Sequence, residues 1–272
     1  MKREYVLESS AEFTRLEAQS RFPAYDYRQE LDGLEIPTRA RILDAGCGSG
    51  VVSRYLAATY PRALVTGCDF SANRVKDATA AAAPFGLGNL DFQTRDLRAL
   101  EFADQTFDVI VCRYVLEHLD APAQLKTVAQ FWRCLKPGGR LRVIDFDGYL
   151  YNLHPQPPGV AETLRQMEQD ARIDLRVGRK LPALLESAGF AELVWDTQSI
   201  DCTGETLKSE ARLTEERLTA ALPYLQLFLK TPERAREFIA EFLEAQARPG
   251  ATHFFTKFRV TGRRPRGLAL AR

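Results

Sequence analysis

Short apolar runs alternate with amphipathic stretches through the centre of the chain, between residues 41 and 146. Five of these runs have the length and composition of buried strands, namely residues 41–46, 63–70, 90–96, 107–113 and 140–146. The stretches between them, such as residues 51–60, 73–83 and 124–135, repeat apolar residues every three or four positions, which predicts helices. This alternation predicts an α/β fold in which helices cover both faces of a parallel sheet.

The flanking stretches depart from this alternation and divide the chain further. Residues 1–38 have a helical period and are expected to form an N-terminal helical cap ahead of a core at residues 39–200. Residues 201–250 are expected to form a helical insertion, or lid, and residues 251–272 a final strand followed by a basic tail. Inside the core, we expect a proline-rich loop and an amphipathic helix between residues 148 and 175.

Composition and charge exclude several classes of partner. The 37 Lys and Arg residues nearly balance the 36 Asp and Glu residues, so no overall field draws the chain to a nucleic acid or an anionic membrane. No apolar run approaches the roughly 18 residues that span a bilayer, and the first residues lack a signal-peptide core. Five cysteines without a C-x-x-C pair indicate neither a disulfide framework nor a metal site. A cytoplasmic enzyme or binding protein is expected.

Three glycines at every second position follow the first predicted strand, in the segment ILDAGCGSG (residues 42–50). In a doubly wound sheet a ligand lies at this strand-to-helix turn, where Gly46 and Gly48 would permit close approach. Val51 stands where a dinucleotide fingerprint needs its third glycine. Asp44 would repel a pyrophosphate and attract an ammonium group. Both observations disfavour a dehydrogenase.

Carboxylates also end the next two predicted strands. Asp69 follows the second strand, where it could accept hydrogen bonds from both hydroxyls of a ribose, and Asp96 follows the third, within reach of an adenine amino group. The fourth strand ends in VCRYVLEHL (residues 111–119), and the turn LKPGGRL (residues 135–141) leads into the fifth.

Together these motifs resemble the class I S-adenosylmethionine-dependent methyltransferases, in particular the small-molecule group that is similar to ubiquinone methyltransferases. The resemblance covers about residues 39–147 and is loose in the flanking segments. It implies a Rossmann-like doubly wound sheet, mostly parallel with an antiparallel last strand, plus helical cap insertions. It also implies S-adenosylmethionine as the cofactor.

The resemblance assigns roles to individual residues around that cofactor. Gly46, Cys47 and Gly48 would pass beneath its methionine part, and Asp44 would face the ammonium, which the main chain at Arg113 would also contact. Asp69 would bind the ribose. Phe70 would cover the adenine or, with similar weight, belong to the core. Asp96 and the backbone of Leu97 would recognise the edge of the ring.

The N-terminal segment offers two further candidates. Tyr5 and Gln19 could touch the cofactor if the segment folds over it, as such segments often do in related enzymes. The alternative, of equal weight, is a helix that packs on the sheet and exposes a polar face.

His118 is the histidine nearest the predicted cleft. It could act as a general base for a hydroxyl acceptor or orient the acceptor. The favoured alternative is a helix residue that packs and hydrogen-bonds locally.

The sequence therefore predicts methyl transfer by in-line displacement to a small-molecule acceptor. The alternatives are a non-catalytic nucleotide-binding or interaction protein on the same fold, or an RNA or protein methyltransferase. The segment CRYV (residues 112–115) stands where methyltransferases of adenine or cytosine amino groups carry Asn/Asp-Pro-Pro-aromatic. The apolar stripes of residues 222–229 and 238–245 could form a lid over an apolar acceptor, a homodimer interface through the cap helices, or ordinary helix packing.

Overall fold

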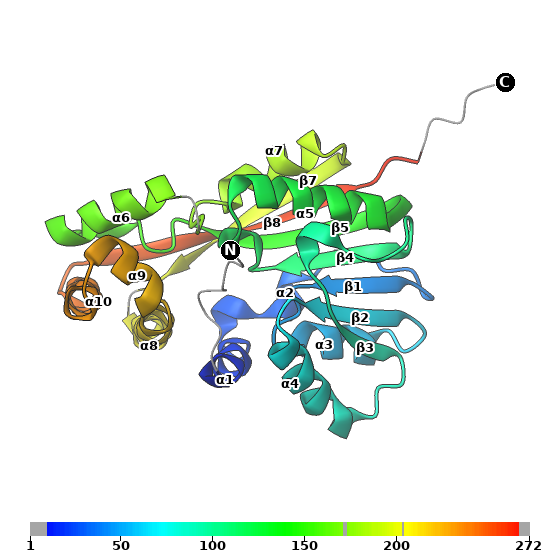
Figure 1. Ribbon diagram of the computed structural model, residues 1–272, viewed down its shortest axis with the longest axis horizontal. Helices are drawn as coiled ribbons and strands as arrows, with labels where there is room; N and C mark the ends of the chain where they lie inside the picture. The colour runs from blue at the N-terminus through cyan, green and yellow to red at the C-terminus, as the bar shows by residue number, and fades with distance from the viewer. Residues whose placement is uncertain (1–9, 171–172, 203, 267–272) are drawn as a thin grey trace.

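The computed structural model describes residues 10–170, 173–202 and 204–266. Within these residues, eight strands form one mixed sheet in the order β3-β2-β1-β4-β5-β8-β6, and β7 pairs with β8 (Figure 1). The first five strands are parallel neighbours: β1 (Arg41–Ala45), β2 (Leu64–Asp69), β3 (Leu90–Thr94), β4 (Phe107–Arg113) and β5 (Leu135–Asp147).

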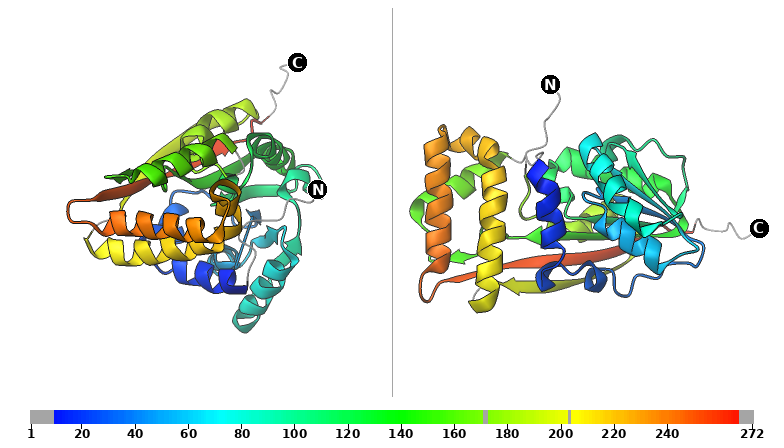
Figure 2. Two further views of the ribbon diagram at one scale, coloured as in Figure 1. Left: turned by 60° about the vertical axis from the view of Figure 1, so that its left-hand side comes forward. Right: turned by 90° about the horizontal axis from the view of Figure 1, so that it is seen from below.

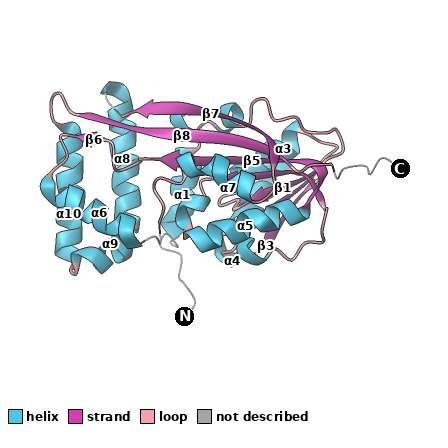
Figure 3. Cartoon of the chain, turned by 90° about the horizontal axis from the view of Figure 1, so that it is seen from above, coloured by secondary structure: helices cyan, strands magenta, loops and turns pink. Residues whose placement is uncertain are grey.

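The long strand β8 (Thr252–Arg263) runs antiparallel to all of its neighbours, which are β5, β6 (Leu153–His154) and β7 (Ala191–Asp201). Figure 3 shows β8 lying between β7 and β5. The prediction of a doubly wound, mostly parallel sheet with an antiparallel last strand is confirmed.

Helices cover both faces of the parallel strands (Figure 1). One face carries α3 (Val51–Thr59) and α4 (Ala72–Ala82), followed by the short turn η2 (Ala83–Phe85). The other face carries α5 (Ala121–Cys134) and α7 (Leu181–Ser187), preceded by η5 (Gly178–Lys180). Buried apolar residues from the strands and these helices form two clusters, one on each face of the sheet.

The remaining helices form a cap beside the sheet. They are α6 (Pro158–Asp170), α8 (Gly204–Ala220), α9 (Leu222–Leu229) and α10 (Pro232–Ala247). A third apolar cluster joins this cap to the ends of β5 and β8, through residues such as Phe146 and Phe255. Pro223 and Pro232 lie in the first turns of α9 and α10, where the N–H that proline lacks would have no partner within the helix. The predicted helical insertion is therefore divided into three helices that begin anew at these prolines.

The N-terminal segment lies between the cap and the sheet. It consists of α1 (Ser10–Gln19), the turn η1 (Pro23–Tyr25) and the short helix α2 (Tyr27–Glu30). Figure 2 shows α1 beside α8 on the side where the parallel strands end. Ligand-binding turns of doubly wound sheets lie at this edge.

One detail differs from the sequence-based expectation. Strand β5 begins at Leu135 and includes the turn-like KPGG, where its pairing with β4 shifts register between Phe107 and Val109.

Nowhere in the described part of the chain is there a helix both long and apolar enough to cross a bilayer.

Candidate active site

The glycine turn joins β1 to α3 and is held against β2. The backbone N–H groups of Gly46 and Cys47 both donate to the Cys68 carbonyl, at 2.8 and 2.9 Å. Gly46 and Gly48 have φ of +79° and +52°, a region that favours glycine. A Cβ at Gly46 would lie 2.4 Å from Cγ2 of Val115. The tight turn therefore needs glycine both for its backbone conformation and for its contacts.

Asp69 ends β2 beside this turn and is only 5% exposed. One carboxylate oxygen accepts from the Gly48 N–H and the other from the Ser71 N–H, both at 3.1 Å. Burial raises its pKa, while Arg74, 3.9 Å away, acts in the opposite direction. A carboxylate has about four acceptor positions, so those that the backbone donors leave open could take the hydroxyls of a ribose.

Asp44 lies near the end of β1 and is 2% exposed. Its carboxylate accepts from the Ser53 hydroxyl of α3 at 2.5 Å. Burial raises the pKa of Asp44 to about 6, although the Ser53 hydrogen bond lowers it. A cationic group placed against Asp44 would offset this desolvation. The residue therefore suits the ammonium of an amino-acid ligand.

The predicted adenine residues lie on the outer rim of this edge. Phe70 is 42% exposed, whereas Leu97, the first residue of η3 (Leu97–Ala99), is buried. Asp96 caps η3 by accepting from the Arg98 N–H at 2.9 Å, and its carboxylate also pairs with the Arg98 guanidinium at 2.7 Å. This ion pair lowers the pKa of Asp96.

Arg113 ends β4, and its side chain contacts the N-terminal segment. Its guanidinium pairs with the buried Glu30 and donates to the Tyr25 carbonyl at 2.8 Å. Glu30 also accepts from the buried Lys257 of β8 at 2.8 Å and from the Tyr114 hydroxyl. This network fastens η1 and α2 to the sheet. The predicted role of Arg113 concerns only its main chain.

The remaining candidates are Cys47 of the glycine turn and two residues of the N-terminal segment, Gln19 and Tyr5. Burial raises the pKa of the Cys47 thiol well above its usual value, so the thiol stays protonated. Gln19 of α1 is buried and accepts from Arg15 at 2.7 Å. Tyr5 lies outside the described residues.

Helix α1 covers the glycine turn. A Cβ at Gly48 would lie 3.1 Å from Cδ1 of Leu16. Glu17 of α1 pairs with Arg54 of α3 at 2.7 Å. These contacts place the N-terminal segment directly over the candidate cofactor site.

His118 lies in the short 3₁₀ turn η4 (Leu116–His118), ahead of α5, and so is not an α-helix residue. Its Nε2 is 3.4 Å from the Glu117 carboxylate. Burial, and then the charges of Arg74, Arg15 and Arg217, lower the pKa of His118 to about 3. The imidazole is therefore neutral near pH 7 and only a weak base.

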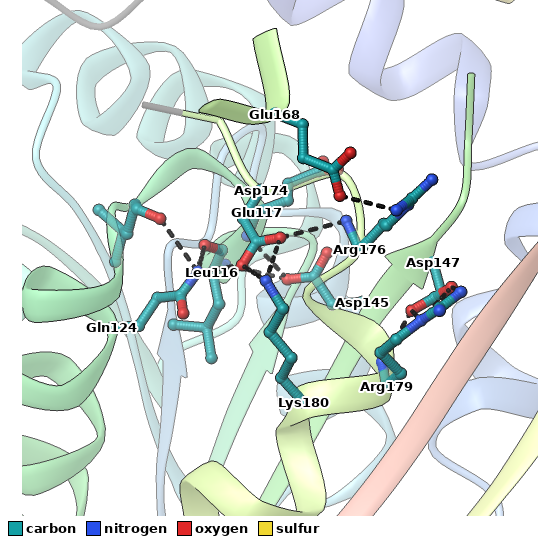
Figure 4. A network of polar contacts seen from close by, with 11 residues as sticks. Leu116, Glu117, Gln124, Asp145, Asp147, Glu168, Asp174, Arg176, Arg179 and Lys180 are labelled. Atoms are coloured by element: carbon teal, nitrogen blue, oxygen red, sulfur yellow. Dashed lines mark hydrogen bonds and ion pairs between the residues drawn. The ribbon is translucent and has the colours of Figure 1, made fainter. Parts of the chain in front are cut away.

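A buried network supports η4 from below (Figure 4). Asp145 of β5 accepts from the N–H groups of Leu116 and Glu117, at 2.9 and 3.2 Å. Gln124 donates to the Leu116 carbonyl and to the Asp174 carboxylate. Burial and then Glu117 raise the pKa of Asp145 well above its usual range. The position of His118 thus depends on a strand residue that sequence analysis did not select. The sequence signal that could have identified Asp145 was an aspartate inside a predicted buried strand.

An aromatic cluster lies next to η4, at the ends of β4 and β5, and consists of Tyr25, Tyr114, Phe146 and Tyr149. The rings of Tyr114 and Phe146 stack with centroids 4.1 Å apart, and Tyr25 meets Phe146 edge-on at 5.9 Å. Tyr149 follows β5, and its hydroxyl bonds to Thr214 of α8 at 2.8 Å. Sequence analysis had not selected Tyr114, Phe146 or Tyr149 as site residues, because core aromatics have the same pattern.

Comparisons with known proteins match this chain to methyltransferases. Residues 42–139 match the family model described as a methyltransferase domain. The chain is 37% identical over 109 residues, 40% of its length, to the ubiquinone/menaquinone biosynthesis C-methyltransferase UbiE of Desulfotalea psychrophila. It is 31% identical over 196 residues, 72% of its length, to phosphoethanolamine N-methyltransferase 1 of Triticum aestivum. The matches span 42% and 37% of the lengths of these two relatives.

A solved structure shows the same fold. Phosphoethanolamine N-methyltransferase 2 of Haemonchus contortus, in complex with S-adenosyl-L-methionine, superposes with a TM-score of 0.63 at 16% identity, over 94% of this chain and 57% of that one. The glycine turn, the carboxylates that flank it and the matched family model lie in one continuous domain. The chain thus contains a methyltransferase domain at residues 42–139 and is similar to the class I S-adenosylmethionine-dependent methyltransferases.

Proposed function

We propose that the protein transfers a methyl group from S-adenosylmethionine to a small-molecule acceptor. The observation that carries this proposal is the pair of buried carboxylates, Asp44 and Asp69, that flank the glycine turn at the ends of β1 and β2. Asp44 suits the ammonium of the cofactor, and the remaining acceptor positions of Asp69 suit its ribose. Gly46, Cys47 and Gly48 would line the methionine part.

The rim residues complete the proposed cofactor site. Phe70 is exposed enough to cover an adenine, and the backbone at Leu97 would meet the edge of the ring. Asp96 would exchange part of its ion pair with Arg98 for the adenine amino group. The main chain of Arg113 and the buried Gln19 would complete the site.

Bound S-adenosylmethionine supplies a sulfonium methyl group, which leaves a neutral thioether when an acceptor displaces it in line. The chain itself has to align the acceptor and exclude water. The aromatic cluster and η4, covered by α1 and α8, form a wall suited to both tasks. In the proposed division, residues 39–200 hold the cofactor while residues 1–38 and 201–250 cover it.

The chemical class of the acceptor atom stays open in this proposal. The relative from Desulfotalea is named for C-methylation and the wheat relative for N-methylation. A core of this kind thus serves acceptors of more than one element. His118, as a neutral imidazole, would orient an acceptor more readily than deprotonate it. The predicted homodimer through the cap helices can be checked by sedimentation.

Calorimetric titration with S-adenosylhomocysteine tests the proposal. We expect saturable binding to the wild-type chain, and release of S-adenosylhomocysteine when S-adenosylmethionine is supplied with a metabolite pool. An Asp91→Asn variant is the control, because Asp91 is an exposed carboxylate near the amino end of β3, opposite the carboxyl edge that carries the candidate site. Absence of saturable binding would favour the alternative, a non-catalytic interaction protein on the same fold. Binding without turnover on small molecules would redirect the search to RNA or protein acceptors.

A further inference from the structure

Tyr114 directly follows β4 and has a backbone conformation that is unusual for its side chain. Its φ is +56°, in the left-handed region that favours glycine. Among the residues that the structure describes, the other non-glycine residues with positive φ are Gln105, Glu192 and Lys230, and all three are exposed. Tyr114 is partly buried and packs against both the apolar cluster of the cap and one of the two clusters of the sheet. Its surroundings therefore hold a conformation that the residue itself disfavours.

The left-handed residue turns the chain from the sheet toward the glycine turn. The Tyr114 N–H still donates to the Ile144 carbonyl of β5, at 2.8 Å, so its backbone stays tied to the sheet. The next residue, Val115, lies against Gly46, because a Cβ at Gly46 would be 2.4 Å from Cγ2 and 3.2 Å from Cγ1 of Val115. The contact between Val115 and the glycine turn therefore depends on the direction in which Tyr114 sends the chain.

Three contacts hold the Tyr114 side chain. Its ring stacks on Phe146 with centroids 4.1 Å apart, and the Arg113 guanidinium lies 4.2 Å from the ring centroid. Its hydroxyl donates to the carboxylate of Glu30, which is fully buried. Glu30 also pairs with Arg113 and, at 2.8 Å, with Lys257. Burial acts to raise the pKa of Glu30, but these two cations outweigh burial and lower it, so the carboxylate is ionised near pH 7.

The Glu30 carboxylate also fastens the segment that covers the glycine turn. Its two cationic partners, Arg113 and Lys257, donate to the carbonyls of Tyr25 and Ala24 in η1, both at 2.8 Å. Helix α1, which lies over the glycine turn, comes shortly before η1 in the chain. Glu30 therefore joins the covering segment and the chain after β4 at one point.

We propose that Tyr114 is a positioning residue of the cofactor site: its left-handed backbone directs Val115 onto the glycine turn, and Glu30 holds it in that conformation. The inference rests on the proposed function, because the glycine turn is the proposed cofactor site. Without the contacts of the side chain, an ordinary residue at this position would relax to negative φ in the free protein. Cofactor binding would then have to restore the left-handed backbone, at a cost that glycine does not have.

Two pairs of variants separate the backbone conformation from the lost side chain. Tyr114→Ala and Tyr114→Gly lose the same ring and hydroxyl, but only glycine accepts positive φ without strain. In calorimetry on the full chain, Tyr114→Ala should bind S-adenosylhomocysteine about tenfold more weakly than Tyr114→Gly, given the cost of the left-handed conformation. Gln105→Ala and Gln105→Gly are the matched controls, because Gln105 has φ +54° in an exposed turn. The two controls should differ in stability but not in affinity.

Hydrogen exchange, measured by mass spectrometry, gives a second readout at the glycine turn itself. The N–H groups of Gly46 and Cys47 are bonded to the Cys68 carbonyl in the wild type. If Tyr114 positions Val115, exchange in residues 42–50 should be faster in Tyr114→Ala than in Tyr114→Gly, and the two Gln105 variants should show no such difference. Tyr114→Phe retains the ring stack and loses only the bond to Glu30. It should weaken binding and speed exchange in the same residues, by less than Tyr114→Ala.

The results separate this inference from the proposed function. If the wild type does not bind S-adenosylhomocysteine, the methyltransferase proposal fails, and the exchange of residues 42–50 still tests the role of Tyr114. If the wild type binds, equal affinities of folded Tyr114→Ala and Tyr114→Gly refute the positioning role of the backbone. Wild-type affinity and exchange in Tyr114→Phe refute the role of Glu30. Circular dichroism reports folding, and if Tyr114→Ala does not fold, Tyr114→Phe decides by the same two measurements.

Discussion

The elevated pKa of Asp44 should make cofactor affinity depend on pH if Asp44 contacts the cofactor as proposed. If the ammonium of the cofactor binds the ionised carboxylate, binding must remove the proton that Asp44 carries below a pH of about 6. The carboxyl is about nine-tenths ionised at pH 7 and about one-tenth ionised at pH 5. We therefore expect the affinity for S-adenosylhomocysteine to fall about tenfold, or about 1.4 kcal/mol, between these values.

Calorimetric titration with S-adenosylhomocysteine from pH 5 to pH 8 measures this dependence. Asp44→Asn should bind more weakly at pH 7 and lose most of the pH dependence below it. Ser53→Ala should shift the midpoint upward, because the Ser53 hydroxyl donates to Asp44 and lowers its pKa. Asp69 also has a raised pKa, so a smaller pH dependence of the affinity that remains in Asp44→Asn would be assigned to Asp69. A flat affinity in the wild type, or an equal slope in Asp44→Asn, refutes the reasoning.

Three further predictions concern single residues. Asp69→Ala should weaken cofactor binding at least tenfold, since each lost charged hydrogen bond costs about 1.5–3 kcal/mol, and unchanged affinity in the folded variant would overturn the ribose assignment. Gly48→Val should abolish detectable cofactor binding, because valine opposes the positive φ and crowds Leu16. Gly33→Val, at φ +70° with open space around it, should cost only stability. Normal methylation by Gly48→Val would contradict this prediction. His118→Ala should lower turnover modestly, because its low pKa makes it a weak base, and a loss of about 10²–10⁴ in kcat at intact binding would instead identify a general base.

Local pattern was sufficient to predict the sheet and the glycine turn at its carboxyl edge. Buried strands and amphipathic helices differ in period, so their alternation predicted the parallel sheet before any contact was known. Because the carboxyl ends of parallel strands meet at one edge, residues that follow those strands, such as Asp69 and Asp96, had to lie near the glycine turn. Glycines at residues 46 and 48 marked the backbone conformation of that turn, since positive φ is a property of a single residue.

Tertiary packing decided which residues surround η4. Tyr25 and Arg217 are 192 residues apart in the chain, and Glu30 and Lys257 are 227 apart, yet each pair is hydrogen-bonded. No periodicity reports such contacts, because the direction of a polar side chain on a cap helix depends on which surface the helix packs against. The same holds for Asp145, whose support of η4 depends on the alignment of β5 with β4. The sequence by itself determined the strands, the glycine turn and the carboxylates at the strand ends, while only the three-dimensional packing of distant segments decided which charges and rings face the space above η4.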